Sequence, residues 1–272
     1  ALAVTSTSAP SKPQAQTQAG PAAANPILAR LASNITPLQD KLPGDATLHI
    51  RNQSPTSTEL GTNGIGLYTD DGIYYWANDK NALRRIVAQK TGGDDSFRRN
   101  IEVALYAVKG DIGTARARMA VANLTPGMKQ NPERDRIEKL KGLAEAKGEE
   151  YVPPKPRTPT EQKEITDNHI WMNSLNALIA APENTQVRAG VLRIMATMPN
   201  VSVKRTTTAG QPTLTLTNIW PTVADRHGET LVIDAGTGRP VALISRVEGK
   251  AVRTTYHHTF RVTLADIAAG KF

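Results

Sequence analysis

The sequence predicts an α+β fold: an antiparallel sheet, flat or curved, built from N-terminal and C-terminal strands and covered on one face by helices from the middle of the chain. Residues 46–77 alternate as strands do and contain a hairpin turn. Residues 162–198 show helical spacing of apolar side chains, and residues 201–262 alternate again between tight turns. Because strands joined by tight turns pair antiparallel, we expect both β-rich ends to share one sheet.

Residues 1–25 differ in composition from the rest of the chain. They are mostly Ala, Pro, Gln, Ser and Thr, with a single charged residue, Lys12. Such a segment cannot bury enough apolar area to offset its chain entropy, so we predict a disordered stalk. The opening residues, 1–4, are either the end of a removed membrane or signal segment or an arbitrary boundary. Residues 26–272 are expected to form a single α+β domain.

The first folded elements follow from caps and alternation. Asn25 and Pro26 predict the start of a short helix that ends near Ile35. A strand over 46–53 places His49 on an exposed face, opposite Leu48. The strands at 64–69 and 72–77 then form a hairpin around Asp70-Asp71-Gly72, and a helix capped by Asn78 covers residues 79–90.

The middle of the chain predicts further helices. One begins near Asp95 or Ser96 and buries Phe97, Ile101, Leu105 and Val108, and a short one lies within 111–122. The polar stretch at about 125–160 predicts an exposed excursion, because a charge-rich helix over 131–147 precedes a proline-rich extended segment over 152–159. The remaining expected elements are helices at 162–180 and 185–198 and strands at 201–207, 213–218, 230–234, 240–247 and 252–262.

Charge and cysteine content limit the classes of function. The chain has no cysteine, which excludes disulfides, thiol nucleophiles and thiolate metal sites. The net charge of +8 is thinly spread: residues 1–90 carry 8 basic and 6 acidic side chains, 91–165 carry 14 and 12, and 166–272 carry 11 and 7. Since phosphate binding needs a concentrated basic face, we expect no nucleic-acid partner.

No catalytic motif is present. There is no Gly-x-Ser-x-Gly elbow, no Ser-x-x-Lys and no His-Glu-x-x-His, and the glycine-rich stretches precede strands rather than helices. The neighbours His257 and His258 point to opposite faces of a strand and cannot share a metal ion. We therefore assign no catalytic residue, no metal and no cofactor. A less favoured alternative, a hydrolase, would use His257, His258, Asp225 and His227.

Aromatic side chains are the candidates for ligand binding. Tyr74 and Trp76 share one face of a strand, and they would line an apolar groove if the helices left the sheet partly open. The alternative is that Trp76 and Trp171 anchor the packing of helices on the sheet. The candidate ligand-binding residues are Tyr74, Trp76, Trp171, Trp220 and Tyr256.

The segment Asp234-Ala235-Gly236-Thr237-Gly238, between two strands, resembles a C-terminal hairpin of bacterial extracytoplasmic proteins, including periplasmic lipoprotein carriers and sigma-factor regulators with a curved half-barrel sheet. The order of stalk, Tyr74-Tyr75-Trp76 strand, helices, Val201–Lys204 strand and Thr-Gly hairpin is similar to a family of actinobacterial membrane-anchored proteins associated with extracytoplasmic-function sigma factors. That family supplies no established catalytic residues, so none is transferred.

The resemblance implies a non-enzymatic extracytoplasmic sensor or interaction domain, tethered to the cell membrane by a segment outside this chain. Its expected partner is a protein or an apolar ligand outside the membrane. An alternative function is that of a carrier for a lipid or another apolar ligand, which would require an open sheet face lined by Trp76, Trp171 or Tyr256.

Overall fold

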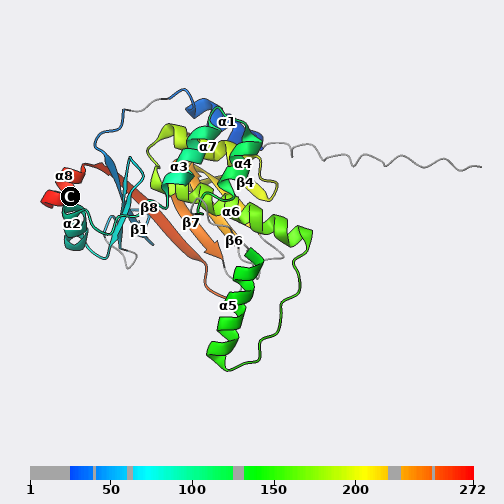
Figure 1. Cartoon of the computed structure of the whole chain (residues 1–272). Coiled ribbons are helices and arrows are strands. Elements are labelled where there is room, and N and C mark those ends of the chain that lie inside the picture. The colour runs from blue at the N-terminus through cyan, green and yellow to red at the C-terminus, as the bar shows by residue number, and fades with distance from the viewer. Residues whose placement is uncertain (1–24, 39–40, 60–63, 125–131, 220–227, 247–248) are drawn as a thin grey trace, which may run out of the picture.

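The computed structural model describes residues 25–38, 41–59, 64–124, 132–219, 228–246 and 249–272, and within them it confirms the α+β fold (Figure 1). The helices are α1 (Pro26–Ile35), α2 (Lys80–Gln89), α3 (Arg98–Ala107), α4 (Ile112–Met119), α5 (Pro132–Lys147), α6 (Pro159–Ala180), α7 (Thr185–Ala196) and α8 (Leu264–Ala269). The strands are β1 (Ala46–Asn52), β2 (Ile65–Thr69), β3 (Tyr74–Ala77), β4 (Val201–Thr208), β5 (Gln211–Ile219), β6 (Gly228–Asp234), β7 (Pro240–Arg246) and β8 (Arg253–Val262).

All the described strands join one antiparallel sheet in the order β3-β2-β1-β8-β7-β6-β5-β4. Strand β1 joins the two parts of the sheet, because Leu48 pairs with Leu67 of β2 on one side and with Phe260 of β8 on the other. Strands β4 to β8 form the predicted meander. The predicted shared sheet is therefore confirmed, and the seam between its two parts is the β1–β8 pair.

The helices lie on both faces of this sheet. Helices α1, α3, α4, α6 and α7 cover β4 to β6, where Trp171, Leu192 and Leu216 belong to the larger core (Figure 1). At the other end, α2 and α8 pack on the opposite face, where Leu48 and Leu67 belong to a second core. The expectation of helices on one face holds for the middle of the chain and misses α2 and α8. Helix α8 was not predicted, although Thr263 caps it and Gly270 ends it.

The predicted burial of the helix near α3 is confirmed at Val108 and wrong at Leu105. Leu105 is 42% exposed, whereas the buried side of the helix contains Val103, Ala104 and Ala107. The cause is the close approach of α7: a Cβ atom added to Gly190 would lie 1.8 Å from the Ala104 carbonyl oxygen. Small side chains therefore face α7, whereas Leu105 points toward solvent and Ile101 is partly buried against the larger core.

The start of α6 and the N-cap of α2 also differ from the sequence prediction. The sequence places Pro159 in the extended linker, but helix α6 begins at this residue. The cause is a capping box that Thr158 and Glu161 form around it. Helix α2 is capped by Asp79 rather than Asn78. Helix α5 forms as predicted, and none of the side chains described within it is buried. The predicted stalk lies outside the described residues except for Asn25, the N-cap of α1.

Arg261 of β8 stabilises the β1–β8 seam of the sheet through several hydrogen bonds. Its side chain is largely buried, and it donates to Thr47 Oγ1 at 2.9 Å, to both carboxylate oxygens of Asp70 at 2.8 and 2.7 Å, and to the carbonyls of Pro43 and Gly44 at 2.9 and 3.2 Å. A guanidinium group has five N–H donors in a planar fork, so this contact set uses the whole group.

We expect Arg261→Lys to lower the free energy of unfolding by about 2 kcal/mol, because an ammonium group cannot reach all these acceptors. The same change at the exposed Arg246 should cost no more than about 0.5 kcal/mol. Urea unfolding of the two variants measures both values. Equal stability of the two variants would contradict the structural role of Arg261.

Candidate functional site

The aromatic residues proposed from the sequence do not converge. Trp171 is fully buried in the larger core and its Nε1–H donates to Glu229 Oε2 at 2.9 Å. Tyr74 and Trp76 share one face of β3, and four strands separate β3 from β6, which carries Glu229. Tyr256 points to the opposite face of the sheet, because it pairs with Asn52, whereas His257 and Arg51 share the face of Tyr74. The fifth candidate, Trp220, lies outside the described residues.

Tyr74 belongs to a packed aromatic cluster. Its ring stacks on Tyr68 with the centroids 4.6 Å apart, and Phe97 meets both rings edge-on at 5.1 and 5.3 Å. Burial raises the pKa of Tyr68 far above its ordinary value, with a further contribution from Tyr74. This cluster fills the space between β2, β3 and the start of α3. Trp76, at the edge of the sheet, remains 45% exposed.

Of the predictions for the histidines, the one for His257 and His258 is confirmed and the one for His49 is wrong. His257 and His258 point to opposite faces of β8, as predicted. The expectation that His49 is exposed is wrong, because only 1% of it is accessible. His49 Nε2 lies 2.9 Å from His257 Nδ1, and the two rings stack with centroids 5.0 Å apart. The pair spans the β1–β8 seam, and the sequence could not reveal it because the register of these distant strands was unknown.

Burial favours the neutral form of both imidazole rings of this pair. Burial lowers the pKa of His49 well below its ordinary value, and His257 and Arg51 add to the effect. Burial also lowers the pKa of His257 to about 4, with further contributions from Arg51 and His258. The outer ring nitrogens, His49 Nδ1 and His257 Nε2, are buried with no hydrogen-bond partner among the described residues. Protonation of either ring would place a charge in this buried site, so we expect it to destabilise the fold.

The geometry of the pair does not suit a metal ion. A metal held between two imidazoles needs each nitrogen about 2.0 Å away on its own side, and the observed separation is that of a direct hydrogen bond. Within the part of the chain that the structure describes, no three His, Cys, Asp or Glu side chains gather at one point. Asp225 and His227, the other residues of the hydrolase alternative, lie outside the described residues.

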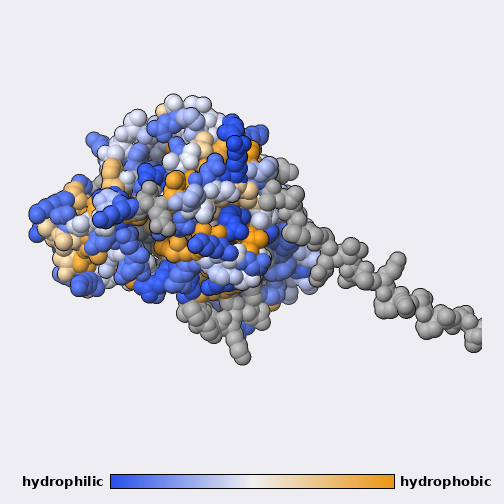
Figure 2. Space-filling view, turned by 90° about the horizontal axis from the view of Figure 1, so that it is seen from above, coloured by the Kyte–Doolittle hydropathy of each residue, from blue (hydrophilic) through white to orange (hydrophobic). Residues whose placement is uncertain are grey.

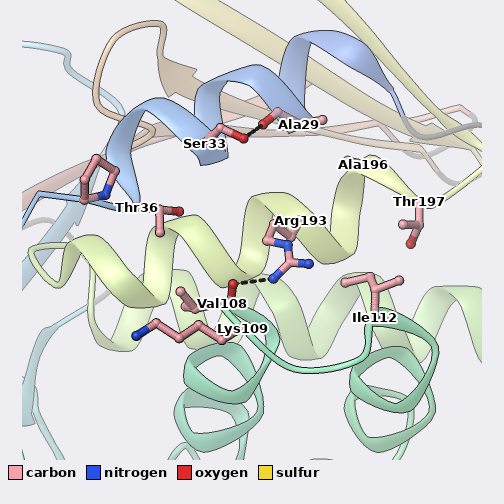
Figure 3. Close-up of a pocket in the computed structure, with 10 residues that line it drawn as sticks. Ala29, Ser33, Thr36, Val108, Lys109, Ile112, Arg193, Ala196 and Thr197 are labelled. Atoms are coloured by element: carbon pink, nitrogen blue, oxygen red, sulfur yellow. Dashed lines mark hydrogen bonds between the residues drawn. The ribbon is translucent and has the colours of Figure 1, made fainter.

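One concavity lies between α1 and α7. This α1 groove has a volume of about 760 Å³ and is closed at its far side by the segment that joins α3 to α4 (Figure 3). Arg193 donates from Nη1 to the Ala107 carbonyl at 2.5 Å and to the Val108 carbonyl, and it thereby caps the C-terminal end of α3. Lys109 extends away from the Arg193 guanidinium. The residues that line the α1 groove are Ala29, Ser33, Thr36, Pro37, Val108, Lys109, Ile112, Arg193, Ala196 and Thr197.

A second concavity lies on the other side of α1. This β4 pocket, of about 450 Å³, is bordered by α1, β4 and the turn after β6. Arg30 of α1 and Arg205 of β4 flank it, Asn34 adds an amide, and Leu214 contributes to its apolar surface. Helix α1 is therefore a wall with a basic concavity on each side. We call Arg30, Lys109, Arg193 and Arg205 the α1 surface.

The cations of the α1 surface have no ion-pair partner in the part of the chain that the structure describes. Residues 184–219 contain no Asp or Glu, and neither do residues 26–38. The nearest acid in sequence to Lys109 is Asp111, whose carboxylate accepts from Thr114 N at 2.7 Å as the N-cap of α4. Unlike the charge totals of long blocks, this acid-free stretch was a usable sequence signal.

Seen from above, the side on which α1 lies in Figure 1, the molecule shows hydrophobic residues in separate patches among strongly hydrophilic ones (Figure 2). A mixed surface of this kind suits recognition of a polar, charged partner better than burial in a lipid core.

No protein-family model, curated protein or solved structure matches the chain. Among the described residues, no helix combines the length and apolarity that crossing a bilayer requires. The resemblance drawn from the sequence therefore stays an expectation, and the function is argued from the residues themselves.

Proposed function

We propose that this protein is a non-enzymatic extracytoplasmic interaction domain that recognises an acidic partner through the α1 surface. The observation that carries the proposal is the pairing of two open concavities with four cations that have no ion-pair partner among the described residues. Cations that no described acidic side chain pairs with can bind carboxylates of another molecule.

The groups in the α1 groove suit binding rather than catalysis. Its side chains supply hydroxyl groups, aliphatic surface and permanent cations. A guanidinium or ammonium group binds carboxylates at neutral pH but cannot act there as a general base. Val108, Ile112 and Ala196 can hold the apolar part of a side chain whose carboxylate reaches Lys109 or Arg193.

The location outside the cytoplasm is part of the proposal. It is supported by the resemblance to membrane-anchored extracytoplasmic proteins, by the nearly uncharged first 25 residues and by the absence of cysteine. Labelling of intact cells with a membrane-impermeant lysine reagent tests it. We expect the native protein to be labelled, and full protection until the cells are lysed would contradict this location.

The alternative function, carriage of an apolar ligand, gains less support. It needed an open sheet face lined by Trp76, Trp171 or Tyr256. Trp171 is enclosed in the core, Tyr256 lies on the opposite face of the sheet from Trp76, and Trp76 is 45% exposed on the edge strand β3. The α1 groove is mixed in polarity, which suits a charged segment with apolar side chains.

The binding proposal is tested with fluorescent glutamate-rich peptides at low and high salt. We expect the wild-type protein to bind them, and added salt to weaken the binding through screening. Arg30→Glu/Lys109→Glu should weaken it about tenfold or more, because two attractions become repulsions.

The matched control is Lys139→Glu/Lys147→Glu on the exposed helix α5, which changes the net charge by the same amount. This control should retain most of the affinity. If both double variants lost affinity equally, the binding would reflect net charge alone, and the assignment to the α1 surface would be wrong.

A further inference from the structure

We infer that the free edge of β4 accepts an extended acidic segment of a partner protein, which adds a strand to the sheet beside the β4 pocket. The inference rests on the proposed function and specifies the partner. An exposed strand edge presents a row of unpaired N–H and C=O groups, and β-strand addition is a common way to bind an extended peptide.

The two edges of the sheet differ. At one edge, β3 is only four residues long, and Tyr74 exchanges two backbone hydrogen bonds with Asp94, N to O at 2.7 and 3.0 Å. At the other edge, β4 has eight residues and pairs only with β5 within the described chain. Ser202 and residues 204–207 are exposed. The long edge is thus open where the short one is covered.

The turn after β4 determines which backbone groups are free. Ala209 and Gly210 both have positive φ angles, 49° and 80°, as a two-residue type I′ turn requires. In such a hairpin the flanking pair, Thr208 with Gln211, is hydrogen-bonded, and bonded pairs then alternate along the strands.

The groups that point away from β5 are therefore those of Val203, Arg205 and Thr207. Pro212, which has no N–H, faces Thr207 at a non-bonded position and agrees with this assignment.

Charge decides between possible occupants. Lys204 and Arg205 are adjacent on β4, so they point to opposite faces of the sheet, and Arg30 adds a cation beside Arg205. Two copies of β4 pairing edge to edge would bring these cations together, which disfavours self-association. An incoming strand with carboxylates on both faces would instead meet Lys204 on one side and the β4 pocket on the other.

The test starts with selection of random linear peptides, displayed on phage, against the whole protein. We expect acidic peptides to be enriched. Thr207→Pro removes an outward N–H without removing a β4–β5 hydrogen bond and should weaken binding of the selected peptide about tenfold or more. Thr207→Ala keeps that N–H and should bind like the wild type.

Backbone amide exchange followed by NMR gives an independent result on the wild-type protein, even if Thr207→Pro does not fold. The bound peptide should slow exchange at Val203, Arg205 and Thr207, and leave the amides that already pair with β5, such as Lys204, unchanged.

The outcomes separate the inference from the function beneath it. Acidic peptides that bind Thr207→Pro as tightly as the wild type, without protecting these amides, would overturn strand addition and leave the α1 surface as the site. If no acidic peptide is enriched, or if only vesicles of phosphatidylglycerol and phosphatidylcholine bind, both proposals fail. Dimerisation that Thr207→Pro abolishes would identify a second copy as the occupant and overturn the acidic partner.

Discussion

Gly190→Ala is expected to lower the free energy of unfolding by about 3 kcal/mol or more. A Cβ atom at this position would lie 1.8 Å from the backbone oxygen of Ala104 and 2.7 Å from its carbonyl carbon. Backbone atoms cannot rotate away as a side chain does, so α3 and α7 would have to separate along a contact that belongs to the main core. Thermal and urea unfolding measure the effect.

The matched control is Gly142→Ala in α5. Nothing lies within 4 Å of a Cβ atom there, and alanine favours a helix interior over glycine by about 1 kcal/mol. This control should be neutral or stabilising. A folded Gly190→Ala protein with wild-type stability would show that the described packing of α3 on α7 is wrong, and with it the position of the α1 groove.

The second large effect is a loss of stability on mild acidification. Both histidines of the seam pair have pKa values lowered in the folded state, and that of His257 falls from 6.5 to about 4. The unfolded chain therefore binds protons first, so the stabilisation is complete above about pH 6.5 and is lost as the pH falls toward about 4. For His257 alone the shift corresponds to about 3 kcal/mol, since one pKa unit is worth about 1.4 kcal/mol.

The control for this effect is His49→Phe/His257→Phe, which can keep a stacked ring pair but has nothing to protonate. Carboxylates titrate in the variant and in the wild type alike, so the difference between their unfolding free energies isolates the histidines. That difference should change steeply between about pH 6.5 and pH 4. Parallel pH profiles for the two proteins would mean that the histidines are not buried together.

Local signals in the sequence predicted most of the elements. Alternation and turn residues identified every described strand, and the predicted Asn25 cap agrees with the start of α1 in the structure. The errors arose where tertiary contacts override local pattern. Leu105 has the spacing of a buried residue, yet the close approach of Gly190 to Ala104 turns a face of small residues inward.

The site was less accessible to sequence reasoning because it depends on elements that are distant along the chain. Arg30 and Arg205 meet across one pocket only because α1 lies over the sheet beside β4. Large aromatic residues drew attention as ligand-binding candidates, but Trp171 proved to be part of the core. Residues 184–219, which contain Arg193 and Arg205 but no Asp or Glu, carry a sequence signal for cations that pair with no described acid, and this signal is visible only in short windows of charge.

The most direct test of the central claim is zero-length carbodiimide cross-linking of a bound acidic peptide to the wild-type protein, with the joined lysines located by mass spectrometry. The reagent joins a carboxylate only to a lysine that it touches. We predict cross-links at Lys109, which belongs to the α1 surface, and at Lys204, which lies on the β4 edge, and none above background at Lys139 or Lys147 on α5. Cross-links at the α5 lysines without any at Lys109 or Lys204 would contradict the account.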